Sequence, residues 1–211
     1  MGQLSFYSAD ATQPRVADLA GVLCGPGQAI GFGAGTAVRL AVPVTQRWRA
    51  VALVAAFAER GVDAVIVGSE GDWLVRTAFR ADLVPLANAW SAVAAPATLA
   101  GADRNRLDGA TLRLWALAAG RSSATGYLLG LDPLSPWTHR PLVTALVRAG
   151  VSPALLDSTD SGADGGPALR VSGTRRLARL VELVGVPPYG VSGHDWPAVV
   201  PVHRGRTSIG A

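Results

Sequence analysis

The stretch that decides the fold is "LAGVLCGPG" at residues 19–27. It closes a longer segment, residues 15–24, in which Val16, Leu19, Ala20 and Leu23 recur at helical spacing and share one face. The glycines that follow, from Gly25 to Gly35, end this helix. We interpret "GFGAG" at 31–35 as a flexible connector, because a dinucleotide-binding loop needs a strand before it and a helix after it.

The residues up to position 90 predict a mixed set of elements. Alternating apolar residues indicate strands, a 3.6-residue period indicates helices, and glycine marks their ends. We expect a strand at 36–44, a helix at 47–61, hairpin strands at 63–69 and 73–79, and a short helix at 81–90 interrupted by Pro85.

The same order returns after a segment of small and polar residues at 91–109, which we interpret as a linker. The second set is a helix at 110–120, a strand at 126–132, a helix at 138–150, strands at 152–158 and 167–172, and a helix at 174–185. This order divides the chain into a first half (1–90), the linker, a second half (110–188) and a C-terminal tail (189–211).

Sequence matches between the halves indicate an internal duplication. "TAVRLAV" at 36 matches "TGYLLGL" at 125, and "LVAAFAERGV" at 53 matches "LVTALVRAGV" at 142, both at an offset of 89. "LVRTA" at 74 matches "LRVSG" at 169, at an offset of 95, or 94 when the following helices are aligned. We therefore predict an α+β chain of two pseudo-symmetric halves, each with a sheet covered by helices on one face.

A duplicated unit that opens with a "LAGxx…G" helix resembles the LAGLIDADG homing endonucleases, over roughly residues 15–187. It also resembles the nuclease-derived domain of WhiA-type bacterial transcription regulators. The resemblance implies αββαββα halves joined along paired motif helices, with antiparallel sheets that form a saddle over duplex DNA. The helix interface would then comprise Leu19, Ala20, Gly21, Cys24, Leu117 and Ala118, with Gly21 and Gly25 permitting close approach.

In that family, acidic residues near the ends of the motif helices hold divalent metal at the scissile phosphates. Here those positions fall on Pro26 and Ala119, which have no carboxylate to bind magnesium. Asp18 lies roughly 12 Å away along the helix and cannot substitute. The three histidines, His139, His194 and His203, show no metal-ligand spacing. We therefore expect no nuclease activity, no metal and no cofactor.

Strand arginines are the candidate nucleic-acid contacts. Alternation places Arg39, Arg76 and Arg170 on the sheet faces that point away from the helices, where they would suit phosphates. Arg175 and Arg176 begin a helix, where the dipole disfavours cations, so an anionic partner is plausible there. The alternative is that these arginines are ordinary solvent-exposed residues that bind no partner. The sequence thus predicts double-stranded DNA as the partner, in a regulatory role, and leaves open a protein partner on the open sheet faces.

Bulk composition limits the other function classes. The net charge is +4 and every basic residue is arginine, a bias that a GC-rich genome explains better than a phosphate-binding surface does. No apolar run reaches the roughly 18–20 residues that span a bilayer, and no signal peptide is evident. The single Cys24 favours a reducing, cytoplasmic compartment, and we expect a monomer.

Overall fold

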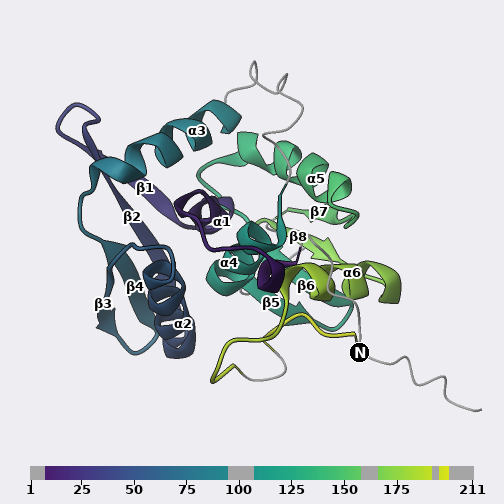
Figure 1. Ribbon diagram of the computed structural model, residues 1–211. Helices are drawn as coiled ribbons and strands as arrows, with labels where there is room; N and C mark the ends of the chain where they lie inside the picture. Colours follow the sequence, from purple (N-terminus) through teal and green to yellow (C-terminus); the bar gives the residue numbers. More distant parts are fainter. Residues whose placement is uncertain (1–7, 95–106, 158–165, 192–194, 200–211) are drawn as a thin grey trace, which may run out of the picture.

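Two open, four-stranded antiparallel sheets lie on either side of a central pair of helices, α1 and α4 (Figure 1). The computed structural model of the chain describes residues 8–94, 107–157, 166–191 and 195–199. The element order is the same in both halves, which confirms the predicted α+β fold of two αββαββα units.

In the first half, a 3-10 turn at Ala9–Ala11 precedes a second one at Val16–Leu19, in which the Asp18 carboxylate accepts a hydrogen bond of 2.9 Å from the Arg15 backbone amide. That bond satisfies an amide left free at the start of the helix. The elements that follow are α1 (Ala20–Cys24), β1 (Gln28–Phe32), β2 (Ala37–Val44), α2 (Arg47–Ala58), β3 (Ala64–Ser69), β4 (Asp72–Thr77) and α3 (Val84–Ala94).

The second half begins at Asp108, whose carboxylate caps the next helix by accepting a hydrogen bond of 2.9 Å from the Thr111 amide. Its elements are α4 (Gly109–Ala119), β5 (Gly120–Ser123), β6 (Gly126–Gly130), α5 (His139–Arg148), β7 (Ala154–Leu156), β8 (Ala168–Val171) and α6 (Thr174–Val184).

Sheet topology repeats as well as element order. The strands run β1-β2-β4-β3 in the first sheet and β5-β6-β8-β7 in the second. The second strands of the two sheets begin at Ala37 and Gly126, which are 89 residues apart, as the sequence matches predict. An internal duplication therefore accounts for both sheets.

The core is centred on α4, which is buried around its whole circumference. Leu112, Leu114 and Trp115 are fully buried, and Leu117 is 1% exposed. A helix that is apolar on every side needs packing partners on every side. The described neighbours of α4 include α1, α2, α6 and strands of both sheets, so one continuous core joins the two halves.

Four local predictions need correction. β1 and β5, the first strand of each sheet, are absent from the predicted elements. The "GFGAG" connector is the end of β1 and its hairpin turn, where Gly33, Ala34 and Gly35 have positive φ. Pro85 is the second residue of α3 and does not interrupt it. Backbone amides in the first turn of a helix have no intrahelical acceptor, so the missing N–H of proline breaks no hydrogen bond there. Residues 91–94 of the predicted linker complete α3, and residues 95–106 lie outside the described chain.

Candidate nucleic-acid interface

The first sheet has one face against the helices and one open face. Strand residues alternate between the two, and directly paired residues share a face. On the helix side, Val38, Leu40, Val42 and Val75 are at most 5% exposed. Arg76 pairs with Ala41 on one neighbour and with Val65 on the other, so it lies on the opposite face. Arg39 lies two residues from Ala41 and shares that open face, as alternation predicts.

Much of the open face around these two arginines is apolar. Ile30, Phe32, Val65 and Val67 belong to it and are 41%, 64%, 56% and 39% exposed. The Arg39 guanidinium lies 4.1 Å from the centre of the Phe79 ring, and Phe32 packs against the same ring at 5.1 Å. This cation–π contact fixes the Arg39 guanidinium over the Phe79 ring. The open face of the first sheet thus presents two arginines, Arg39 and Arg76, surrounded by apolar side chains.

The second sheet presents two arginines in one row across its strands. Arg121 on β5 pairs with Leu128 on β6, which in turn pairs with Arg170 on β8. Residues paired in this way have Cβ atoms about 4.5–5.5 Å apart. The arginine stems therefore lie beside Leu128, which is only 5% exposed. The sequence does not predict Arg121 as a sheet residue, because Gly120 marks the end of the preceding helix and the short strand β5 has no alternating pattern.

The arginines of the two sheets do not occupy equivalent positions. At the offset of 89, Ala41 on β2 corresponds to Gly130 on β6, and their partners on the fourth strands are Arg76 and Ala168. Those partners are 92 residues apart, so Arg170 stands two residues beyond the position on β8 that corresponds to Arg76. A shift of two residues preserves the face, which is why Arg170 still lies on the open side.

Three of the five predicted arginines therefore lie on the open faces. Arg175 and Arg176 are exposed in the first turn of α6, a helix that packs against α4 on the other side of the sheet. Among the described residues, no ion pair is formed by Arg39, Arg76, Arg121 or Arg170. The Nε atoms of Arg39 and Arg170 are buried without a hydrogen-bond acceptor in that part of the chain.

Helix α1 packs against α4, and these two helices, with the 3-10 turn before α1, carry the residues of the predicted interface. Leu19, Cys24, Leu117 and Ala118 are at most 5% exposed, Gly21 is buried, and Ala20 is half-buried. A methyl group added to Gly21 would collide with the Thr111 carbonyl oxygen, so only glycine permits this approach. At the other end of the contact, a methyl group on Gly25 would lie 2.8 Å from the Ala119 side chain. The C-terminal ends of the two helices therefore meet, with Pro26 and Ala119 beside the contact.

A buried arginine that the sequence did not single out occupies this meeting point. Arg49 on α2 is 5% exposed, and its guanidinium donates to the carbonyl oxygens of Ala116 and Leu117 at 2.9 Å each, and to that of Gly120. Its Nε also donates to Gln46 at 2.7 Å. Burial lowers the pKa of Arg49, and the nearby Tyr127 and Asp195 oppose that shift. The carbonyls that end α4 thus have a protein cation as their partner.

Solved structures share this architecture. The chain resembles the DUF199/WhiA N-terminal LAGLIDADG domain with a TM-score of 0.55 and 9% identity, over 89% of this chain and 93% of that one. It resembles I-DmoI in complex with DNA and Mn with a TM-score of 0.52 and 14% identity, over 82% and 97% of the two chains. It resembles the homing endonuclease I-WcaI bound to its DNA recognition sequence with a TM-score of 0.51 and 12% identity, over 87% of this chain and 89% of that one. The chain has the LAGLIDADG homing-endonuclease fold.

The identities of 9–14% make this a likeness of fold alone. Full-length DUF199/WhiA from Thermatoga maritima is similar with a TM-score of 0.52, and this chain spans 58% of its length. No family model and no curated protein sequence matches the chain.

The residues at the LAGLIDADG helix ends do not fit a divalent metal. Pro26 and Ala119 offer no side-chain oxygen, and the nearest described charge on the α4 carbonyls is the Arg49 guanidinium, which repels a cation. Among the described residues, no group of three or more His, Cys, Asp and Glu side chains could hold a metal ion. His194 and His203 lie outside the described chain.

Two further features of the fold bear on chemistry and location. Cys24 is fully enclosed, donates weakly to the Ala20 carbonyl, and has its pKa raised by burial, so its thiol stays protonated as a core residue. Within the described ranges, no helix has the length and apolar character that crossing a membrane requires.

Proposed function

We propose that the protein binds nucleic acid, with double-stranded DNA as the leading ligand, along the open faces of its two sheets and without cleaving it. The observation that carries the proposal is the set of four arginines on these faces: Arg39, Arg76, Arg121 and Arg170. None has a described acidic partner, so each can offer its charge to a phosphate. The same fold is bound to DNA in I-DmoI and I-WcaI.

The proposed lack of cleavage rests on the helix ends. Phosphodiester hydrolysis by metals needs hard oxygen ligands at one point, and Pro26 and Ala119 supply none. A protein that binds a duplex and leaves it intact suits a regulatory role.

The test is duplex affinity measured across salt concentrations. A fluorescein-labelled duplex of random sequence should bind at low salt, and its affinity should fall steeply as salt rises, because each neutralised phosphate releases a counterion. The same samples incubated with Mg²⁺ or Mn²⁺ should show uncut duplex. The proposed binding is wrong if no duplex binds at low salt, and the proposed inactivity is wrong if purified protein cuts the duplex with metal.

A protein partner is the second candidate, because the first sheet's open face exposes Ile30, Phe32, Val65 and Val67. Contiguous exposed apolar side chains are typical of interaction surfaces. A photo-crosslinker placed at Val67 and, as control, at the exposed Ala178 on α6 separates the two candidates. Crosslinks to a labelled duplex from position 67 favour nucleic acid, whereas a folded protein that binds no duplex favours the protein partner.

A further inference from the structure

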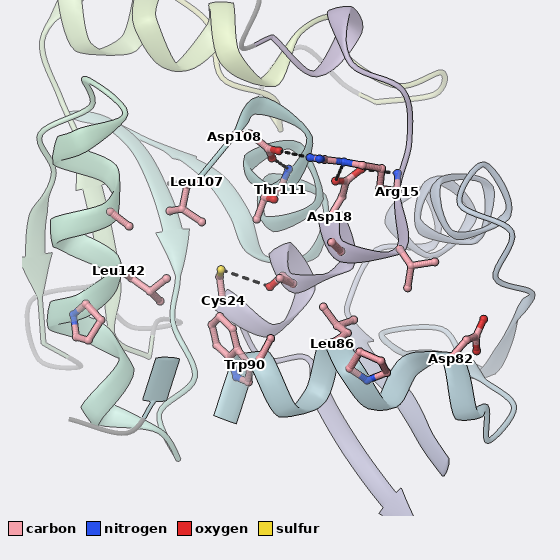
Figure 2. Close-up of a pocket in the computed structure, with 17 residues that line it drawn as sticks. Arg15, Asp18, Cys24, Asp82, Leu86, Trp90, Leu107, Asp108, Thr111 and Leu142 are labelled. Atoms are coloured by element: carbon pink, nitrogen blue, oxygen red, sulfur yellow. Dashed lines mark hydrogen bonds and ion pairs between the residues drawn. The ribbon is translucent and has the colours of Figure 1, made fainter. Parts of the chain in front are cut away.

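A cavity of about 490 Å³ lies among the helices at the junction of the two halves. Its walls come from α1 and the turn before it, from α3, from the start of α4 and from α5 (Figure 2). None of its lining residues belongs to a strand, so the cavity is separate from the open sheet faces. Its volume falls within the range of roughly 300–1,000 Å³ that small-molecule sites occupy.

The body of the cavity is apolar. Leu86 and Trp90 line it from α3, and Leu142 lines it from α5, with Leu107 and Cys24 completing the wall (Figure 2). Leu86 and Leu142 are 8% and 3% exposed, and Trp90 is half-buried. An aromatic or aliphatic ligand would therefore gain most of its affinity from contact with these side chains.

One end of the cavity is polar and rich in carboxylates. Arg15 donates to Asp108 at 2.9 Å, and its Nε lies 3.5 Å from Oδ1 of Asp18. Asp18 is 1% exposed, and its Oδ2 accepts hydrogen bonds from the Arg60 side chain and the Arg15 amide. Its Oδ1 accepts no hydrogen bond from any described residue, which leaves a buried acceptor at this end.

Among its described lining residues, the cavity offers no free cation to an anion. Of its three carboxylates, Asp82 is paired with Arg80, and Asp18 is paired with Arg60 as well as with Arg15. Arg15 already pairs with two of these carboxylates, so it has little capacity left for an anionic ligand. A hydrogen-bond donor on the ligand, in contrast, meets carboxylate oxygens.

We propose that this cavity is a binding site for a small apolar molecule that carries an uncharged donor or an amine, and that it excludes anionic analogues. The ligand would contact α1 and α3 of the first half together with α4 and α5 of the second. It would therefore stabilise the folded chain and the packing between the halves. This site does not depend on the proposed nucleic-acid binding.

Two dyes that share the same rings test the proposal. N-phenyl-1-naphthylamine has an apolar body and an N–H donor, and 8-anilino-1-naphthalenesulfonate adds a sulfonate to that body. In a fluorescence titration of the full chain, the uncharged dye should saturate one site, with an affinity at least tenfold higher than that of the sulfonate. It should also raise the thermal midpoint, because a ligand that binds only the folded state stabilises it.

Two alanine-to-phenylalanine substitutions, one in the cavity and one outside it, locate the bound dye. Ala89 lies on α3, lines the cavity and is exposed, so Ala89→Phe should fill the cavity without disturbing the core. Ala178 on α6 is an exposed helical alanine outside the cavity, and Ala178→Phe is the control. We expect Ala89→Phe to weaken the uncharged dye at least tenfold and Ala178→Phe to leave it unchanged.

Circular dichroism and the thermal midpoint of the dye-free variants confirm that both remain folded. Trp90→Ala removes an aromatic wall and should weaken the uncharged dye as well, which gives a second readout if Ala89→Phe alters the helix. Absence of saturable binding, or equal affinity in the wild type and Ala89→Phe, would overturn the site. Equal affinity for the two dyes would overturn its preference for an uncharged or amine-bearing ligand.

Discussion

Arg49 donates a hydrogen bond of 2.9 Å to the carbonyl oxygen of Ala116, across the boundary between the two halves. The same guanidinium reaches Leu117 and Gly120, so one side chain from α2 satisfies three carbonyls at the end of the central helix. The Ala116 carbonyl also accepts the Gly120 amide that caps the helix, and the negative end of the helix dipole favours a cation at all three carbonyls. The contact therefore ties the first half to the second.

Replacement of Arg49 should destabilise the protein strongly. Arg49→Met keeps most of the buried volume but removes the guanidinium donations to the Ala116, Leu117 and Gly120 carbonyls, so we expect a loss of at least about 3 kcal/mol in the free energy of unfolding. Urea denaturation followed by circular dichroism measures it. Arg47 lies on the same helix and is exposed, so Arg47→Met should change stability by no more than about 0.5 kcal/mol. Equal effects of the two substitutions would contradict the role given to Arg49.

Gly21 sets the separation of the paired helices. Gly21→Ala places a methyl group against the Thr111 carbonyl and the Leu114 side chain, and we expect it to cost about 1–3 kcal/mol of stability through overpacking. Gly31 on β1 has open space where its Cβ would stand, so Gly31→Ala is the control and should be close to neutral. The result would be inconsistent with the structure if the control were the more damaging substitution.

The duplication was readable from sequence because it rests on local patterns. Helix α2 and its counterpart α5 carry an apolar period and a glycine stop, and Gly61 and Gly150 both adopt positive φ. Hairpin β3–β4 follows from alternation around Gly71, which also has positive φ. Features of this kind need no knowledge of tertiary contacts.

Other features depend on contacts that a single sequence does not display. β5 is four residues long and contains Gly120, Arg121 and two serines, which have no strand pattern of their own. It exists because it pairs with β6. Arg49 likewise follows Arg47 and Trp48 in an ordinary helix, and only the packing of α2 on α4 shows that it is buried. The roles of Arg121 and Arg49 could not be predicted from the sequence, because the positions of both residues depend on tertiary contacts.

The open-face arginines should control the salt dependence of duplex binding. Replacing both Arg121 and Arg170 with glutamine removes two phosphate contacts, so the slope of log affinity against log salt should fall by about 1.8. Arg148, exposed on α5 away from the open face, is the control, and Arg148→Gln should leave the slope unchanged. A double variant with the wild-type slope would exclude the second sheet from the interface, even if binding itself persists.

Tyr127 should make the protein less stable at alkaline pH. Burial raises the pKa of Tyr127 above its ordinary value of 10.0, and its hydroxyl donates to the Asp195 carbonyl at 3.3 Å. Above pH 10 the unfolded chain releases this proton while the folded chain retains it, so the unfolded state binds fewer protons. Stability from this group is thus complete below pH 10 and declines above it, by up to about 1.4 kcal/mol per pH unit.

Comparison with Tyr127→Phe isolates this contribution. The chain contains no lysine, so few other groups titrate in this range, although Cys24, whose pKa burial also raises, adds a decline of the same sign. Phenylalanine keeps the buried ring and cannot ionise. Between pH 9 and 11, urea denaturation should show the wild type losing stability more steeply than Tyr127→Phe. If the two proteins lost stability equally with pH, Tyr127 would titrate alike in the folded and unfolded chains. That result would contradict the burial of its hydroxyl beside Asp195.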